Sequence, residues 1–171
     1  MTRAVILLIG LILASPVCRA QTVEDIDKLD TALYDAWLKT PLAVRKAVFV
    51  AKHPDGFGMY TPRDNNVYKP GEPLVAYVEP IGYGWKEQSG GYEFGFNVDF
   101  LIKSADGKIL GGQQNFAKLI KQSRVRNREF MLTLTMDVSG ADPGEYVLEY
   151  VLHDVASGKT ATVDLPFKIG K

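Results

Sequence analysis

The chain has 171 residues, 46% of them hydrophobic, which is typical of a globular domain and not of a disordered chain. Its 20 Lys and Arg balance its 20 Asp and Glu, so the charge gives no whole-protein reason to expect nucleic acid as a partner. Without the leader described next, about 150 residues remain, enough for one domain with its own core.

The N-terminus has the layout of a secretory signal peptide. Arg3 gives it a positive start, and residues 4–14 form an apolar run that is too short to span a bilayer in a mature protein. The small residues Cys18 and Ala20 precede a suitable cleavage point. We therefore predict a Sec-type leader over residues 1–20, cleavage after Ala20, and a periplasmic or secreted product without a transmembrane segment.

Cys18 is the single cysteine of the chain. Cleavage after Ala20 would remove it, so the mature protein would have no disulfide, thiol nucleophile or thiolate metal site. An alternative is that Cys18 carries a lipid. The preceding Ser15, Pro16 and Val17 differ from the Leu-small-small run that usually precedes a lipidated cysteine, which favours the soluble product.

Residues 21–40 are expected to form an N-terminal amphipathic helix. Thr22 suits the N-cap, Glu24 and Asp25 place acids in the first turn, and the Thr40-Pro41 step ends the helix. The apolar residues recur at helical spacing and form one stripe, made of Val23, Ile26, Leu29, Leu33, Ala36 and Trp37. Two roles stay open. The helix packs on the main domain or is a mobile arm, or it docks to a partner with Trp37 as the anchor.

Residues 41–171 change to an alternating pattern that predicts an antiparallel β-sandwich of about seven strands, each with one apolar face. The expected strands lie at residues 43–51, 73–79, 92–102, 108–112, 130–136, 146–152 and 161–169. Glycine-rich loops are expected at residues 53–66 and 80–91, and a long polar connection at residues 113–128.

One short motif carries a resemblance to a known fold. Asp142, Gly144 and Tyr146 fit the D-x-G-x-Y pattern of the tyrosine corner, in which the phenol bonds back to the chain before its strand. Leu148 stands where antibody domains have their second cysteine. Residues 45–170 therefore resemble immunoglobulin-like or fibronectin type III-like domains of exported bacterial proteins of uncharacterised function. The resemblance implies an all-β immunoglobulin-like sandwich and no particular activity.

Chemical motifs are largely missing from the mature sequence. It contains no G-x-S-x-G, H-E-x-x-H, G-x-x-x-x-G-K-[ST] or C-x-x-C. A zinc or copper site on His53 and His153 would need further ligands such as Asp55, Met59 or Asp154. Carboxylate pairs for glycoside hydrolysis could be assembled from Glu79, Glu93, Asp99 and Glu149. Such strand residues normally face solvent, so we predict no catalytic residue, cofactor or metal. A small hydrolase or metal-dependent enzyme remains an alternative, which requires both histidines and acids to meet in one pocket.

The two glycine-rich loops carry several aromatic residues. Tyr83, Trp85, Tyr60 and Phe57 are the candidate ligand or partner surface, and Tyr83-Gly84-Trp85 is expected to form an exposed tip because flanking glycines suit one. The alternative is that these rings cap the core. If exposed and coplanar, they would suit a carbohydrate-binding module.

A local cluster of bases lies on the expected long connection. It consists of Lys118, Lys121, Arg124, Arg126 and Arg128 and could meet anionic envelope polymers, lipid phosphates or an acidic partner. It could equally be an ordinary solvated loop. The main prediction is a non-catalytic exported binding or interaction module of the cell envelope, with an envelope protein or glycan as its partner.

Overall fold

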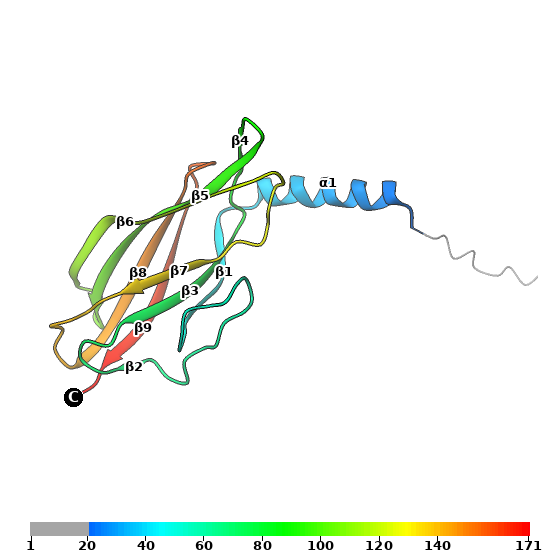
Figure 1. Ribbon diagram of the computed structural model, residues 1–171. Coiled ribbons are helices and arrows are strands. Elements are labelled where there is room, and N and C mark those ends of the chain that lie inside the picture. The colour runs from blue at the N-terminus through cyan, green and yellow to red at the C-terminus, as the bar shows by residue number, and fades with distance from the viewer. Residues whose placement is uncertain (1–20) are drawn as a thin grey trace, which may run out of the picture.

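The computed structural model describes residues 21–171, and the predicted leader with Cys18 lies outside the described residues. The chain is mostly β, with one helix near the N-terminus (Figure 1). The elements are α1 (Val23–Lys39), β1 (Ala43–Phe49), β2 (Val67–Tyr68), β3 (Leu74–Ile81), β4 (Lys86–Gln88), β5 (Gly91–Ser104), β6 (Ile109–Ser123), β7 (Leu132–Met136), β8 (Gly144–Asp154) and β9 (Thr160–Ile169). Within residues 21–171, no helix has both the length and the apolar character needed to cross a membrane.

The predicted helix is found as α1, with both of its predicted ends. The Thr22 hydroxyl accepts the Asp25 backbone N–H, and the Asp25 carboxylate accepts the Thr22 backbone N–H, which forms a capping box. The Thr40 N–H closes the last turn on the carbonyls of Ala36 and Trp37. Figure 1 shows α1 projecting away from the sheets, with its C-terminal end at their edge.

The strands form two sheets. The smaller has the order β1-β3-β7, and the larger has the order β2-β9-β8-β5, with β6 on the other side of β5. The short β4 pairs with the start of β5. All of these pairings are antiparallel except the one between β2 and β9.

Strand β6 is longer than the sequence pattern suggested. It runs to Ser123, whereas the sequence pattern suggested a strand ending at Gly112 and then a long loop. The strict alternation is missing because Asn115 adopts a left-handed conformation (φ 51°) and the pairing with β5 shifts register between Val98 and Phe100. β6 is also a largely solvated edge strand, so its polar residues resemble those of a loop.

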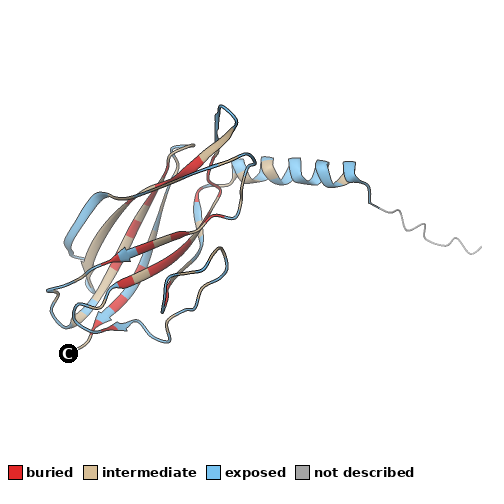
Figure 2. Ribbon diagram, viewed as in Figure 1, coloured by how far each residue is buried: buried red, intermediate tan, exposed pale blue. Residues whose placement is uncertain are grey.

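One hydrophobic core lies between the two sheets. The smaller sheet contributes Leu74, Ala76 and Val78, and the larger contributes inward residues of β5 and β8 such as Phe96 and Leu152. Figure 2 shows the buried segments along the strand centres, while α1 is almost entirely exposed. Of α1, the half-buried Trp37 packs against this core, whose buried residues all come from outside the helix.

The predicted tyrosine-corner bond is present. The Tyr146 hydroxyl donates to the Asp142 carbonyl oxygen at 2.7 Å. The Tyr146 ring also stacks on Phe167 of β9, with centroids 5.4 Å apart. This contact ties the segment before β8 to the larger sheet, as the D-x-G-x-Y pattern predicted.

Candidate functional site

The C-terminal half of α1 is seated on aromatic rings. The Trp37 indole N–H donates to the Tyr83 carbonyl oxygen at 2.8 Å, and the Trp37 ring packs edge-on against Tyr83. Tyr34 and Trp37 lie 5.6 and 5.7 Å from the Trp85 ring, centroid to centroid. Trp37 thus anchors the helix to its own domain, which is the first of the two roles that the sequence left open, and in this arrangement its ring is engaged by Tyr83 and Trp85.

Lys159 fixes the end of the helix from a different part of the chain. Its ammonium group donates to the carbonyl oxygens of Leu38, Thr40 and Gly82 at 2.9, 2.8 and 2.9 Å. A positive charge at a helix C-terminus also opposes the partial negative charge of the unpaired carbonyls. The sequence indicated only a turn here, since a lysine beside a glycine carries no signal of its carbonyl partners.

Tyr83 is buried, which corrects its expected exposure. Its exposed fraction is 0%, its ring packs against Phe94 and Phe130, and its hydroxyl donates to the Asn127 carbonyl oxygen at 2.9 Å. Burial raises the pKa of the phenol well above its ordinary value. Tyr83 therefore belongs to the core and offers no ring to a ligand.

Gly84 explains why the exposed tip does not form. A Cβ atom on Gly84 would lie 3.0 Å from the Cβ of Ser157, so this glycine permits close approach of the β8–β9 turn. The Gly84 N–H donates to the buried Asp154 carboxylate at 2.7 Å. The same Tyr-Gly-Trp sequence fits both a protruding tip and a tightly packed corner.

The remaining candidate aromatics do not form one surface. Trp85 is half-buried beneath α1 and donates its indole N–H to the Asn127 carbonyl oxygen at 3.0 Å. Tyr60 is half-buried and stacks on Tyr77, with centroids 4.2 Å apart. Phe57 is half-buried and lies near the base of α1. These rings are not the exposed coplanar row that a carbohydrate-binding module requires.

The basic cluster divides into two groups. Lys118 and Lys121 are exposed on β6, and Arg124 is exposed just after it. Arg126 lies over the Tyr34 ring at 3.9 Å from its centroid, and Arg128 pairs with Asp30 of α1 at 2.9 Å. The expected single patch on a loop is therefore wrong in its geometry, because only the two later arginines reach the helix.

A groove of about 510 Å³ lies where α1 meets the sheets. We call it the helix-base groove, and it is lined by Leu33, Trp37, Arg45, Phe57, Val125, Arg126, Asn127, Arg128 and Glu129. Three guanidinium groups thus surround apolar and aromatic side chains. Arg45 had no motif to identify it, since it stands alone on an otherwise ordinary strand.

The N-terminal part of the α1 stripe is not covered by the sheets. The exposed fractions are 71% for Val23, 61% for Ile26, 63% for Leu29 and 48% for Leu33. We call these four residues the helix stripe. The sequence predicted the stripe from its spacing, and the structure shows that it continues outward from the helix-base groove as an uncovered apolar surface.

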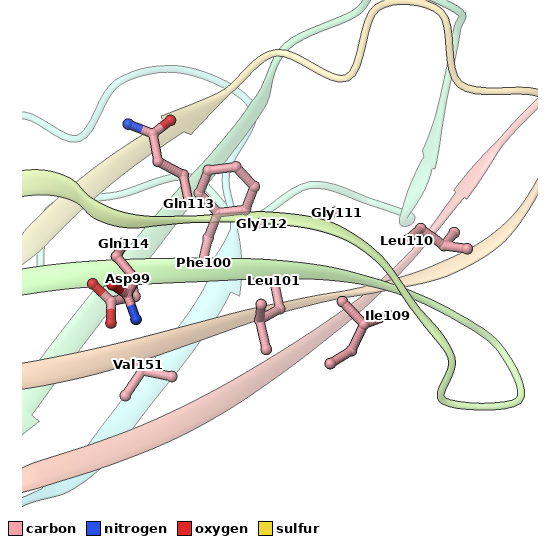
Figure 3. Close-up of a pocket in the computed structure, with 10 residues that line it drawn as sticks. All are labelled: Asp99, Phe100, Leu101, Ile109, Leu110, Gly111, Gly112, Gln113, Gln114 and Val151. Atoms are coloured by element: carbon pink, nitrogen blue, oxygen red, sulfur yellow. The ribbon is translucent and has the colours of Figure 1, made fainter.

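A second hollow lies on the outer side of β5 and β6, with a volume of about 450 Å³ (Figure 3). Asp99 at its rim accepts the Asn115 backbone N–H at 2.7 Å and pairs with His153 at 2.8 Å. These bonds, the one from Asn115 first, hold the pKa of Asp99 below its usual value. No serine, threonine, cysteine or lysine lines this hollow, so it holds no side chain of the types that act as nucleophiles beside a His–Asp pair.

The acids and histidines considered for catalysis do not meet at one site. Glu79 accepts the Tyr77 hydroxyl at 2.5 Å, and Glu149 pairs with Lys103 at 2.6 Å. His53 is exposed in the loop after β1. Across residues 21–171, no group of three or more His, Cys, Asp or Glu side chains is placed to hold a metal ion.

The fold and these surfaces define a mostly β protein of two sheets that carries one projecting amphipathic helix. No protein-family model matches the chain, and a search of curated proteins finds no match. The helix stripe and the helix-base groove are the surfaces of the described chain best suited to an interaction.

Proposed function

We propose that the mature chain is a non-catalytic exported module of the cell envelope that binds a partner through α1 and the helix-base groove. The observation that carries this proposal is the exposure of the four large side chains of the helix stripe on a helix that is fixed at one end. Burying a side chain of this size contributes about 1.5–3 kcal/mol. Contiguous exposed apolar surface is typical of interaction sites.

The attachment of α1 supports a binding role because it orders the helix in advance. Trp37 and Lys159 hold its C-terminal end, the Arg128–Asp30 pair holds its middle, and the capping box orders its first turn. A surface that is already ordered loses less conformational entropy when it binds. The helix stripe is thus suited to recognition.

Export belongs to this proposal and rests on the leader pattern of residues 1–20. The immunoglobulin-like topology belongs to it as well. It is supported by the orders β1-β3-β7 and, leaving aside the short β2 and β4, β9-β8-β5-β6, which we compare with strands A-B-E and G-F-C-C′ of that fold. Tyr146 stands near the start of β8, where strand F carries the tyrosine corner. Both features support an extracytoplasmic sandwich domain.

The test is site-specific photocrosslinking in cells that make the full chain. Benzoylphenylalanine replaces Leu29 on the helix stripe or Thr31 on the opposite face of α1. We expect a crosslinked product from position 29 and none from position 31. Equal products at both positions, or none at position 29 in a folded protein, would contradict binding through the stripe.

A second arm uses matched substitutions. The variant Ile26→Ser/Leu29→Ser removes two stripe residues, and Lys28→Ser/Asp35→Ser changes the polar face while leaving the net charge of the helix unchanged. Since α1 has no buried residue, neither variant should alter the stability of the sheets. In this arm benzoylphenylalanine replaces Leu33, a stripe residue that both variants retain. We expect only the stripe variant to abolish crosslinking from this position.

A further inference from the structure

We infer that the partner of α1 is a second copy of this chain, packed about a two-fold axis with the two helices antiparallel. This inference rests on the proposed function, because it assigns an occupant to the same helix stripe and helix-base groove. It follows from the distribution of charge along the helix, the spacing of the stripe and the composition of the groove.

The outer half of α1 is acidic. Glu24, Asp25, Asp27 and Asp30 lie there with a single base, Lys28. Asp30 already pairs with Arg128 of its own chain, whereas no ion pair joins Glu24 or Asp27 to another residue of the described chain. By helical spacing, Asp25 and Asp30 flank the stripe at Ile26 and Leu29, whereas Glu24 and Asp27 lie toward the far side of the helix. No ion pair joins Asp25 to another described residue, so it is the unneutralised carboxylate beside the stripe.

The helix-base groove is basic. It contains the guanidinium groups of Arg45, Arg126 and Arg128 against one lining acid, Glu129. Arg128 already pairs with Asp30 and Arg126 lies 3.8 Å from Glu87, so Arg45 supplies the unpaired charge. Arg45 is exposed and has no ion pair with any residue in 21–171. The Arg128–Asp30 pair shows that a carboxylate on a helix fits this groove. A second acidic helix would meet complementary charge there.

The spacing of the stripe suits a helix as its occupant. Ile26, Leu29, Leu33 and Ala36 follow the 3-4-3 spacing of a coiled-coil seam, which packs against an equivalent seam. A parallel pair would place the acidic halves side by side. An antiparallel pair places the acidic outer half of each α1 against the basic groove of the other copy, and it opposes the two helix dipoles.

The charge of α1 argues against a membrane surface as the occupant. The helix carries five acids against Lys28 and Lys39. Anionic headgroups attract basic amphipathic helices and would repel this one. Binding to vesicles is therefore an outcome that the test must be able to detect.

The experiment is sedimentation equilibrium of the exported chain over a range of micromolar concentrations. We expect twice the monomer mass for the natural chain and for Lys28→Ser/Asp35→Ser, and the monomer mass for Ile26→Ser/Leu29→Ser. Thermal unfolding of each variant checks that the sheets stay folded. A stripe variant that dimerises as the natural chain does would overturn the inference.

Charge exchange tests the antiparallel arrangement. Arg45→Glu and Asp25→Lys should each weaken self-association, by roughly tenfold or more if the charges come close. A mixture of the two single variants should restore the dimer as a pair of unlike copies. In that pair, the outer half of each α1 meets a charge of opposite sign in the groove of the other copy. Failure of the mixture to recover would contradict this arrangement.

The remaining outcomes separate this inference from the proposed function. A natural chain that is monomeric at every concentration, yet still crosslinks another protein from position 29, overturns self-association and leaves the proposed function standing. Monomeric chain that sediments with phosphatidylglycerol vesicles through the stripe assigns the surface to a membrane instead. A monomer that neither crosslinks nor binds vesicles contradicts both.

Discussion

The backbone N–H of Gly84 donates to the carboxylate of Asp154 at 2.7 Å, inside a corner where Asp154 is only 2% exposed. The same carboxylate accepts the Ala156 N–H at 2.9 Å and the Ser157 hydroxyl. It thereby joins the β3–β4 connection to the β8–β9 turn, and Lys159 of that turn holds the end of α1. We call the contacts of Trp37, Trp85 and Lys159 at the C-terminal end of α1 the helix seat. The helix seat therefore depends on the buried carboxylate of Asp154.

Replacing Asp154 by alanine should cost about 3 kcal/mol of unfolding free energy, because three donors would lose a charged acceptor. Denaturant titration followed by circular dichroism measures it. Asp106→Ala, in the exposed β5–β6 turn, is the matched control and should cost much less than Asp154→Ala. Equal losses for both variants would show that the corner has no special role.

Tyr146→Phe should lower the unfolding free energy by about 1 kcal/mol, because it removes the bond to the Asp142 carbonyl. The chain offers a matched comparison in Tyr150. That hydroxyl is buried without a hydrogen-bond partner among the described residues, so Tyr150→Phe should be neutral or stabilising. The reverse order of the two effects in urea unfolding would refute this assignment.

Lys159→Gln should loosen α1 while leaving the core intact, because only the ammonium group reaches three carbonyl oxygens at once. We expect faster amide exchange at the end of α1 and a changed tryptophan emission, since Trp37 and Trp85 both lie in the seat. Lys168→Gln, on β9, is the control. Unchanged exchange in α1 would mean that the aromatic contacts suffice to hold it.

The pKa of Asp99 is lowered in the folded chain, first by the Asn115 N–H and then by His153. A lowered carboxyl pKa stabilises the fold at a pH above the unfolded value, about 3.9, and this contribution is lost as the pH falls through the folded value. Unfolding free energy should therefore decline below about pH 4. Asp99→Asn should make the unfolding free energy depend less steeply on pH below about pH 4. Denaturant titrations at several pH values measure this, and parallel curves of unfolding free energy against pH for the two proteins would contradict it.

The sequence predicted the strands with clear alternation because a half-buried strand must alternate, and β5 shows this with Phe94, Phe96 and Val98 buried. It failed at β6, where the bulge at Asn115 changes the phase of the pattern. The alternation of apolar residues in a sequence indicates which face of a strand is buried. It does not indicate where the pairing with a neighbouring strand shifts register.

The candidate site was less predictable because it depends on contacts between distant segments. Gly84, between Tyr83 and Trp85, is compatible with an exposed tip or with a tightly packed corner. Only the close approach of Ser157 in the folded chain shows that it forms a corner. The spacing of the apolar residues of α1 was readable, but it did not show that only Trp37 would contact the rings of the domain while the helix stripe stays exposed. The arginines of the groove come from two separate segments, so no linear motif joins them.

The bulge at Asn115 has a consequence for how copies of the chain can meet. An uninterrupted edge strand of 15 residues would be an open template on which another chain could add a strand and begin aggregation. The left-handed residue divides that edge into two shorter parts, and Lys118 and Lys121 place charge on one of them. The larger sheet is thus protected against strand addition along β6, which directs association away from the backbone and toward side chains.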